Sequence, residues 1–279
     1  MTVHSIAQQG FGVGTNEVYD RARPSYQSSV LAQIHQSIPK ERSAPFNIAE
    51  IGAGTGIFTR ALLAHPDWNS SIAEIRAVEP SSGMRAQFEK TVSSSGVKVS
   101  AKEGSFTDTG IEDGWADIVV IAQAYHWAHP NYDGASKEFA RILRPSGIVV
   151  YVWNLEDSAR ANWIAQLRDL YEKYEGGSPQ FRLGLWRVTF DSPIYSTLFK
   201  SQVEQAFEWS IPTTVEAVLE RVTSKSYIAI LAQDKKEEYG KLISEAQEML
   251  GREEKKWIDK DAGVFEYPYK TTLIIAQKK

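Results

Sequence analysis

The segment from Glu50 to Gly56, which reads EIGAGTG, carries the clearest chemical signal in the chain. It follows an apolar, strand-like run and precedes a segment with helical spacing. Glycines in such a turn let the backbone bend tightly and let a ligand approach the start of the helix. The pattern therefore predicts a cradle for a nucleotide-like ligand, formed by Gly52, Gly54 and Gly56.

The residue types around this turn distinguish between possible ligands. A dinucleotide fingerprint requires a small third residue, whereas the corresponding position here is Ile57, which argues against NAD. S-adenosylmethionine has no phosphates but has a cationic amino-acid end, which suits the carboxylate of Glu50. We therefore expect S-adenosylmethionine, with S-adenosylhomocysteine as the product.

Further contacts to this ligand are expected after the next two strands. Glu79 follows the second strand-like run, a position from which a carboxylate accepts hydrogen bonds from both ribose hydroxyls; the alternative is a solvated loop acid. Ser105 and Phe106 follow the third run and are expected beside the adenine. For Phe106, a plain core position is an equally good interpretation.

His126 is the candidate catalytic residue. It follows the fourth strand-like run, at the edge of an open sheet where ligands bind, and imidazole exchanges protons near neutral pH. The alternative is that His126 only packs beneath the ligand. If the molecule that accepts the methyl group from S-adenosylmethionine does so on a carboxylate, that group is already ionised and needs no base. The other histidines lack the spacing of metal ligands, and methyl transfer needs no metal, so we expect no metal site.

Aromatic and basic side chains later in the chain are candidates for an acceptor pocket. The alternatives are a core role for the aromatics and surface ion pairs for the arginines. The candidates are Trp153, Trp186, Tyr195, Tyr227, Arg23, Arg182, Arg187 and Arg221.

Strand-like and helix-like segments alternate through the first part of the chain, a pattern typical of a parallel sheet covered by helices on both faces. The expected strands are Phe46 to Ile51, Ile72 to Val78, Val97 to Ala101, Ala116 to Ala122 and Ile148 to Trp153. The expected helices between them are Ile57 to Ala64, Ser82 to Ser93 and Tyr132 to Leu143.

The pattern changes after the fifth strand. An aromatic-rich stretch with weak periodicity, residues 181–199, is expected to be a substrate-facing cap, and two late strands are expected to complete a seven-stranded sheet with an antiparallel edge strand. The other expected elements are helices at 157–175, 213–231 and 235–250 and strands at 203–209 and 267–276. We expect one domain, with an N-terminal lid and helix (1–43), a cofactor-binding core (44–154), a helical and aromatic cap (155–202) and C-terminal strands and helices that complete the sheet (203–279).

Composition narrows the class of partner. The 279 residues include 31 basic and 35 acidic residues without a long basic run, which disfavours nucleic acid as a partner. The chain has no cysteine, no secretory signal pattern from Met1 to Gly14 and no apolar run that would span a membrane. We expect a cytoplasmic protein, a monomer or homodimer, with a small-molecule acceptor.

Several motifs together resemble the class I methyltransferases of the UbiE-like, type 11 kind, and within them the fungal small-molecule branch that contains trans-aconitate methyltransferase. The resemblance extends over nearly the whole chain. Besides Glu50 to Gly56, the motifs are Tyr19 to Tyr26, Glu79 to Ser81, Gln123 to Trp127, Leu143 to Gly147, Trp153 to Leu155, Trp209-Ser210 and Ser224 to Tyr227.

This resemblance implies a Rossmann-like fold and S-adenosylmethionine as methyl donor. It also implies that Gln123 and Ala124 line the sulfonium side and that Tyr19 and Arg23 close over the cofactor. We expect O-methylation of a carboxylate or hydroxyl. The alternatives are N-, S- or C-methylation in secondary metabolism, a non-catalytic protein that binds S-adenosylmethionine, and an NAD-dependent oxidoreductase.

Overall fold

The computed structural model describes residues 16–92 and 96–279, and the segment from Met1 to Gly14, in which no secretory signal is expected, lies outside them. The α-helices are α2 (Asn16–Ala22), α3 (Ser28–Gln36), α4 (Ile57–Ala64), α5 (Ser82–Thr91), α6 (Tyr132–Ile142), α7 (Asn162–Tyr171), α8 (Pro193–Leu198), α9 (Val215–Thr223), α10 (Ser226–Asp234) and α11 (Lys236–Arg252). Short 3-10 helices are η1 (Tyr125–Ala128), η2 (Glu172–Tyr174), η3 (Phe181–Leu183) and η4 (Leu185–Thr189).

Within the described residues, eight strands form one sheet in the order β3-β2-β1-β4-β5-β8-β6, with β7 paired to β8. The strands are β1 (Phe46–Ile51), β2 (Ile72–Val78), β3 (Lys98–Lys102), β4 (Ala116–Ala122), β5 (Leu143–Glu156), β6 (Val203–Thr213), β7 (Trp257–Asp259) and β8 (Val264–Gln277). The first five are parallel, and β8 is antiparallel to both β5 and β6. The expected Rossmann-like fold is confirmed.

The place of the antiparallel strand differs from the expectation. β8 lies one strand inside the edge because it pairs along most of its length with β5 on one side and β6 on the other. β6 is therefore the edge strand, and the short β7 adds an eighth strand that the sequence pattern did not indicate.

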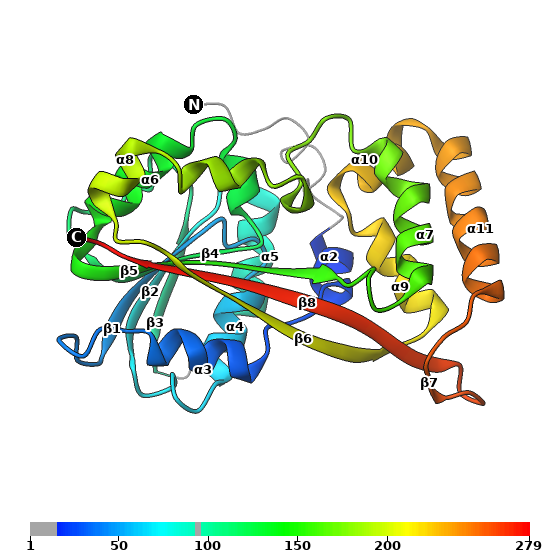
Figure 1. The fold of residues 1–279 in the computed structure, drawn as a ribbon, viewed down its shortest axis with the longest axis horizontal. Helices are drawn as coiled ribbons and strands as arrows, with labels where there is room; N and C mark the ends of the chain where they lie inside the picture. Colours follow the sequence, from blue (N-terminus) through cyan, green and yellow to red (C-terminus); the bar gives the residue numbers. More distant parts are fainter. Residues whose placement is uncertain (1–15, 93–95) are drawn as a thin grey trace.

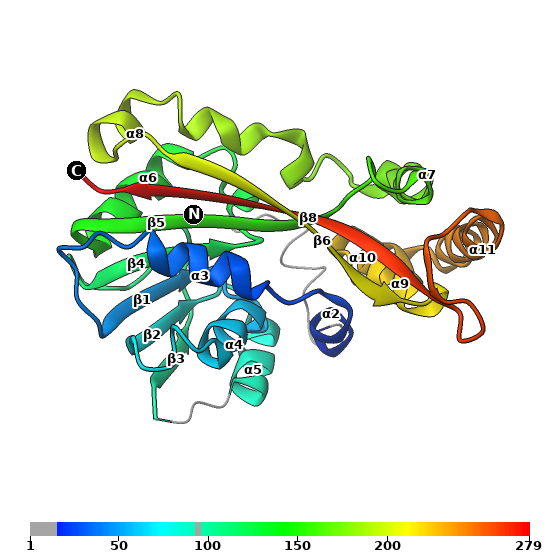
Figure 2. The ribbon, with the colours of Figure 1, turned by 60° about the horizontal axis from the view of Figure 1, so that its bottom comes forward.

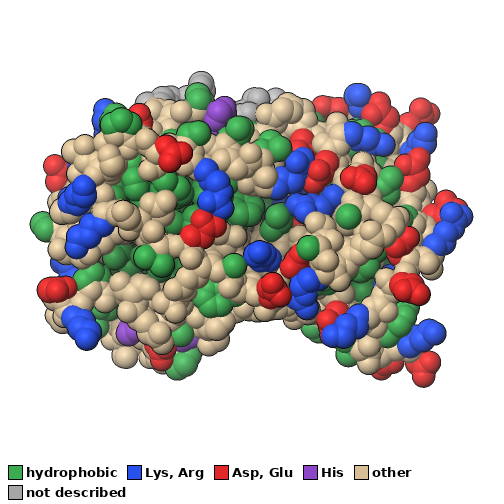
Figure 3. All heavy atoms as spheres, in the orientation of Figure 1, with side chains coloured by type: hydrophobic (Ala, Val, Ile, Leu, Met, Phe, Trp, Pro, Cys, Tyr) green, Lys and Arg blue, Asp and Glu red, His purple; other side chains and the backbone are tan. Residues whose placement is uncertain are grey.

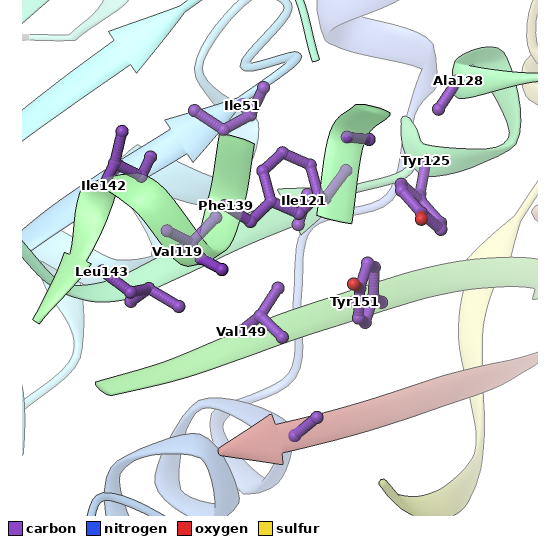
Figure 4. Close-up of a cluster of buried hydrophobic side chains, with 14 of the residues drawn as sticks. Ile51, Val119, Ile121, Tyr125, Ala128, Phe139, Ile142, Leu143, Val149 and Tyr151 are labelled. Atoms are coloured by element: carbon purple, nitrogen blue, oxygen red, sulfur yellow. The ribbon is translucent and has the colours of Figure 1, made fainter. Parts of the chain in front are cut away.

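Helices cover both faces of the parallel sheet, which explains why β4 is buried at every position and apolar at all of them except Asp117. Figure 2 shows α6 and α8 on one side of the sheet and α3, α4 and α5 on the other. On the first side, Tyr125, Phe139 and Tyr151 pack together, as Figure 4 shows, with the rings of Tyr125 and Tyr151 4.6 Å apart. This packing holds η1, and with it His126, against the end of the sheet.

The aromatic stretch expected to be a cap forms η3, η4 and α8. Trp186, Tyr195 and Phe199 are almost completely buried in the same core cluster as β4 and β5. Their irregular spacing fits short helices that lie over one sheet face, and most of their ring surface therefore contributes to the core.

β6 and β8 extend beyond the parallel strands and carry a second group of helices, α7, α9, α10 and α11, seen at the right of Figure 1. The single helix expected over 213–231 is wrong. The chain is extended at Lys225 (φ −76°, ψ 134°), which separates α9 from α10. Figure 3 shows charged side chains of both signs over this part, and on α11 Lys241 pairs with Glu245.

Candidate functional site

A cavity of about 330 Å³, here called the first cavity, opens at the carboxyl ends of β1, β2 and β4. This is the edge of an open parallel sheet at which ligands bind. All residues expected to bind the ligand line this cavity except Gly56, namely Tyr19, Arg23, Glu50, Gly52, Gly54, Glu79, Ser105, Phe106, Gln123 and Ala124. The topology thus brings together residues that are up to 105 positions apart in the chain.

The three glycines of the turn have different surroundings. All have positive φ, which a side chain would strain. A Cβ at Gly52 would lie 2.6 Å from the Cβ of Ala124, whereas a Cβ at Gly54 would meet no atom within 4 Å. A Cβ at Gly56 would lie 2.5 Å from Val92, so Gly56 permits packing against α5 and does not line the first cavity.

Glu79 fixes the glycine turn from the end of β2. One carboxylate oxygen accepts a hydrogen bond from the backbone N–H of Gly54 at 2.9 Å, and the other accepts from the backbone N–H of Ser81 at 2.9 Å. Burial raises the pKa of Glu79, while these two donors act in the opposite direction. The carboxylate therefore shapes the cavity wall in addition to lining it.

Glu50 is buried at the end of β1 and accepts a short hydrogen bond from the hydroxyl of Thr59. Burial raises its pKa to about 8, although Thr59 and the charge of Arg60 act against this shift. A cation beside Glu50 would favour the ionised form. The site is therefore suited to a ligand that brings its own positive charge.

The N-terminal segment closes one side of the cavity. In α2, Asp20 accepts a hydrogen bond from the hydroxyl of Thr55 at 2.5 Å and forms an ion pair with Arg60 at 2.6 Å. Arg23 donates to the side chain and to the backbone carbonyl of Ser224, both at 3.1 Å. The segment is thus tied both to the glycine turn and to the turn between α9 and α10.

Gln123 has a left-handed backbone (φ 58°), which is uncommon for a residue with a side chain. Its amide group is held by two hydrogen bonds to the backbone of Asn154, at 2.8 and 2.9 Å. Asn154 in turn donates to the carbonyl of Ser25 and accepts from Thr271. These bonds hold the turn after β4 and its neighbour Ala124 in place.

A second cavity, of about 80 Å³, lies next to the first. Tyr19, Arg23, Gln123 and Trp127 line both, so the two cavities share a wall. Its other lining is rich in charge. The charged side chains are Arg23, Arg168, Arg182, Arg221, Lys225, Glu156, Glu172 and Glu175.

His126 lines the second cavity and not the first. Burial, and to a smaller extent the charge of Arg23, lower its pKa to about 3, so the ring is neutral at neutral pH. The indole N–H of Trp153 lies 3.4 Å from Nδ1, which places the imidazole proton on Nε2. His126 is therefore a weak base in this protein.

The structure separates the other acceptor-pocket candidates. Trp153, Tyr227, Arg182 and Arg221 line the second cavity with Arg23, while the remaining candidates do not. Trp186 and Tyr195 belong to the core, and Arg187 forms an exposed ion pair with Glu204.

Glu156 and Lys225 were missed as site residues. Glu156 ends β5, and a charged residue at the carboxyl end of a parallel strand is itself a signal for the ligand-binding edge. Lys225 belongs to the Ser224 to Tyr227 motif, but the direction in which its side chain points depends on the break between α9 and α10. Periodicity does not reveal that break.

Clusters of metal ligands and membrane-spanning helices are both absent from residues 16–92 and 96–279. These residues contain no group of three or more His, Cys, Asp or Glu side chains placed to hold a metal ion. None of their helices is long and apolar enough to cross a membrane.

Comparisons with known proteins agree with this geometry. Residues 49–151 match the family model for a methyltransferase domain. An uncharacterised methyltransferase of Mycobacterium tuberculosis is 31% identical over 213 residues, which cover 75% of this chain and 74% of the relative. An uncharacterised methyltransferase-like protein of Schizosaccharomyces pombe is 29% identical over 235 residues and 84% of each chain.

Solved structures share the fold. A proposed type II methyltransferase from Anaeromyxobacter dehalogenans superposes with a TM-score of 0.55 at 16% identity, covering 92% of this chain and 96% of that one. The YcgJ protein of Bacillus subtilis gives 0.50 at 18% identity, covering 91% and 99%. The sequence relatives and the family model show that the chain belongs to the class I S-adenosylmethionine-dependent methyltransferases.

Proposed function

We propose that the protein transfers a methyl group from S-adenosylmethionine to an oxygen atom of a small-molecule acceptor. The observation that carries this proposal is the wall of four residues shared by the two cavities. A donor in the first cavity and an acceptor in the second would meet at this wall. Alignment of the two reactants is the main contribution that a protein makes to such a displacement.

The residues of the first cavity fit S-adenosylmethionine. The unfilled space at Gly54 leaves room for the ligand beside the backbone. Glu50 would hold the amino-acid end, Glu79 the ribose, and Ser105 with Phe106 the adenine, while Gln123 and Ala124 would face the sulfonium. When bound, S-adenosylmethionine supplies a methyl carbon activated by a positively charged sulfur.

The residues around the shared wall would exclude water and position the acceptor. Tyr19 and Arg23 lie over both cavities and are anchored to Ser224 through Arg23. His126, proposed as the catalytic residue from the sequence, is better suited to donating a hydrogen bond from Nε2 than to removing a proton. An oxygen that is already ionised, as in a carboxylate, therefore suits this site better than a hydroxyl.

The small second cavity supports a small-molecule acceptor and gives no reason to propose nucleic acid or membrane as a partner. The motifs of the sequence are the basis for proposing a place near the fungal small-molecule branch, while the relatives of similar sequence come from both fission yeast and Mycobacterium. We further propose a cytoplasmic monomer or homodimer, organised as one domain in which residues 1–43 supply a lid and a helix before the cofactor-binding core at 44–154.

Thermal-shift measurement followed by a labelled-methyl assay tests this function. S-adenosylmethionine and S-adenosylhomocysteine should stabilise the protein, by about 2.7 kcal/mol at a hundredfold excess over Kd, and NAD should not. Incubation with methyl-labelled S-adenosylmethionine and a panel of small carboxylic acids and alcohols should then label an acceptor. Alkali releases methanol from a methyl ester and not from an ether. Stabilisation by NAD alone would refute the proposal, and label on nitrogen or carbon would refute oxygen as the acceptor atom.

The raised pKa of Glu50 predicts a proton released on cofactor binding. With a pKa of about 8, Glu50 is mostly protonated at pH 7, and a bound ammonium group favours its ionised form. Calorimetry at pH 7 in two buffers of different ionisation enthalpy should show release of nearly one proton per S-adenosylhomocysteine. Glu50→Gln should bind more weakly and without this release. Equal proton release from Glu50→Gln would remove Glu50 from the amino-acid end.

A further inference from the structure

The charges that line the second cavity are unequal in number, with more cations than carboxylates. Three carboxylates serve as ion-pair partners. Glu156 pairs with Arg221 at 2.6 Å and with Lys225 at 3.5 Å, while Glu172 and Glu175 pair with Arg182 and Arg168. The five cationic side chains that line the cavity therefore have only three carboxylates in its lining as ion-pair partners.

Arg23 is the clearest case. Its guanidinium donates to Ser224 and lies 4.5 Å from the centre of the Tyr19 ring, but it forms no ion pair with a carboxylate among the described residues. Burial and the neighbouring charge of Arg221 lower its pKa. The side chain of Arg221 is 4% exposed, and its Nε has no hydrogen-bond partner in the part of the chain that the structure describes. Buried donors of this kind are costly unless a ligand accepts from them.

Lys225 lies in the middle of these groups. Its ammonium group is 4.6 Å from the centre of the Tyr171 ring. Burial lowers its pKa to about 7, Glu156 acts in the opposite direction, and Arg221, Arg23 and Arg168 lower it further. The titratable and charged groups that line the cavity with it are Tyr19, Arg23, His126, Glu156, Arg168, Tyr171, Glu172, Glu175, Arg182, Arg221 and Tyr227.

We propose that the second cavity binds an acidic group of the acceptor, held by Arg23, Arg221 and Lys225, and that Lys225 takes up a proton when this group binds. The proposal rests on the proposed function, since it defines the acceptor of that reaction as an anion. A bound anion supplies the missing negative charge, accepts from the unpartnered Nε of Arg221 and favours the charged form of Lys225.

Neutral or cationic ligands fit this cavity less well. A neutral ligand leaves the excess of positive charge uncompensated, and a cation adds to it. The volume of about 80 Å³ accommodates a carboxylate with a few attached carbons. The shared wall at Arg23 and Gln123 would place the remainder of such an acceptor next to the methyl donor.

Titration of succinate into the protein, with and without S-adenosylhomocysteine, tests the proposal between pH 6.5 and 9. Over this range succinate itself stays a dianion, so a pH dependence reports on the protein. We expect the Kd for succinate to rise by up to about tenfold per pH unit above pH 7, because binding requires the protonated lysine. Succinamide, which has the same shape without charge, should not bind.

Variants of Lys225 make the test specific. Lys225→Met should weaken succinate binding at least tenfold at pH 6.5 and should show a flat pH profile. Lys225→Arg, which stays charged, should bind tightly at every pH. Lys235→Met removes an exposed lysine that pairs with Glu238, and it should behave as the wild type.

Three results would overturn the proposal: equal binding of succinamide, a flat profile in the wild type, or an unchanged profile in Lys225→Met. Each of these results is distinguishable from failure of the proposed function. Binding of S-adenosylhomocysteine and transfer of labelled methyl, measured in the same preparations, test that function separately. Inorganic phosphate in place of succinate separates a carboxylate site from a phosphate site. The cavity should prefer succinate, and tighter binding of phosphate would reassign the acidic group.

Discussion

Gly54→Val should reduce the affinity for S-adenosylmethionine at least a hundredfold while the protein remains folded. A Cβ at this position meets no atom within 4 Å, so the valine side chain enters the first cavity without disturbing the core. The backbone of Gly54 has φ +56°, and a β-branched residue there costs about 1–2 kcal/mol. This cost lowers Tm by a few degrees and does not unfold a domain of this size.

Gly110 provides a matched control for Gly54. It has a similar φ of +64°, and a Cβ there would also meet nothing within 4 Å, but it does not line either cavity. Gly110→Val should therefore lower Tm by a similar amount and bind S-adenosylmethionine as the wild type does. Calorimetry and thermal unfolding of both variants separate strain from loss of ligand space. Wild-type affinity in Gly54→Val would show that the cofactor lies elsewhere.

Local sequence signals were sufficient for the parallel sheet and for the first cavity. β1, β2 and β4 coincide with the expected strand-like runs, because apolar residues predominate in each of them and β4 is buried at every position. The glycine turn and Glu79 also depend only on their positions after these strands. Since parallel strands align their carboxyl ends, order along the chain was enough to predict which residues meet.

The second cavity depends on contacts that no local pattern reveals. Glu156 and Arg221 are 65 positions apart, and their pairing requires both the extension of β5 and the end of α9 at Thr223. The chemistry of His126 likewise depends on its burial beside Trp153. Residue type alone predicts a histidine that titrates near neutrality, whereas the folded surroundings keep it neutral.

The ion pair between Glu156 and Arg221 is expected to be the largest single electrostatic contribution to stability around the second cavity. The side chains are 1% and 4% exposed, and the pair joins the end of β5 to α9. Burial alone would raise the pKa of Glu156, but Arg221 and Lys225 hold it well below its usual range. Glu156→Gln leaves the charge of Arg221 buried without compensation and should cost about 3–5 kcal/mol.

Chemical unfolding of Glu156→Gln should be compared with that of Glu204→Gln. Glu204 forms a two-bond ion pair with Arg187 on the surface, where both side chains are more than 40% exposed, so its loss should cost less than about 1 kcal/mol. The double variant Glu156→Leu/Arg221→Met removes both buried charges and should recover much of the loss. Equal destabilisation by the two single variants would show that the buried pair is no stronger than the surface pair.

The pH dependence gives the same pair an independent signature. Because the pKa of Glu156 is lower in the folded protein than in the unfolded chain, its stabilisation is complete above the unfolded value of about 4.5. The contribution decreases as the pH falls from there toward the folded value. In a Lys225→Met background, where the lysine beside Glu156 no longer titrates near neutral pH, the loss of unfolding free energy caused by Glu156→Gln should therefore be constant from pH 6 to 7 and shrink below about pH 4.5. A difference that grows on acidification would contradict a carboxylate held ionised by Arg221.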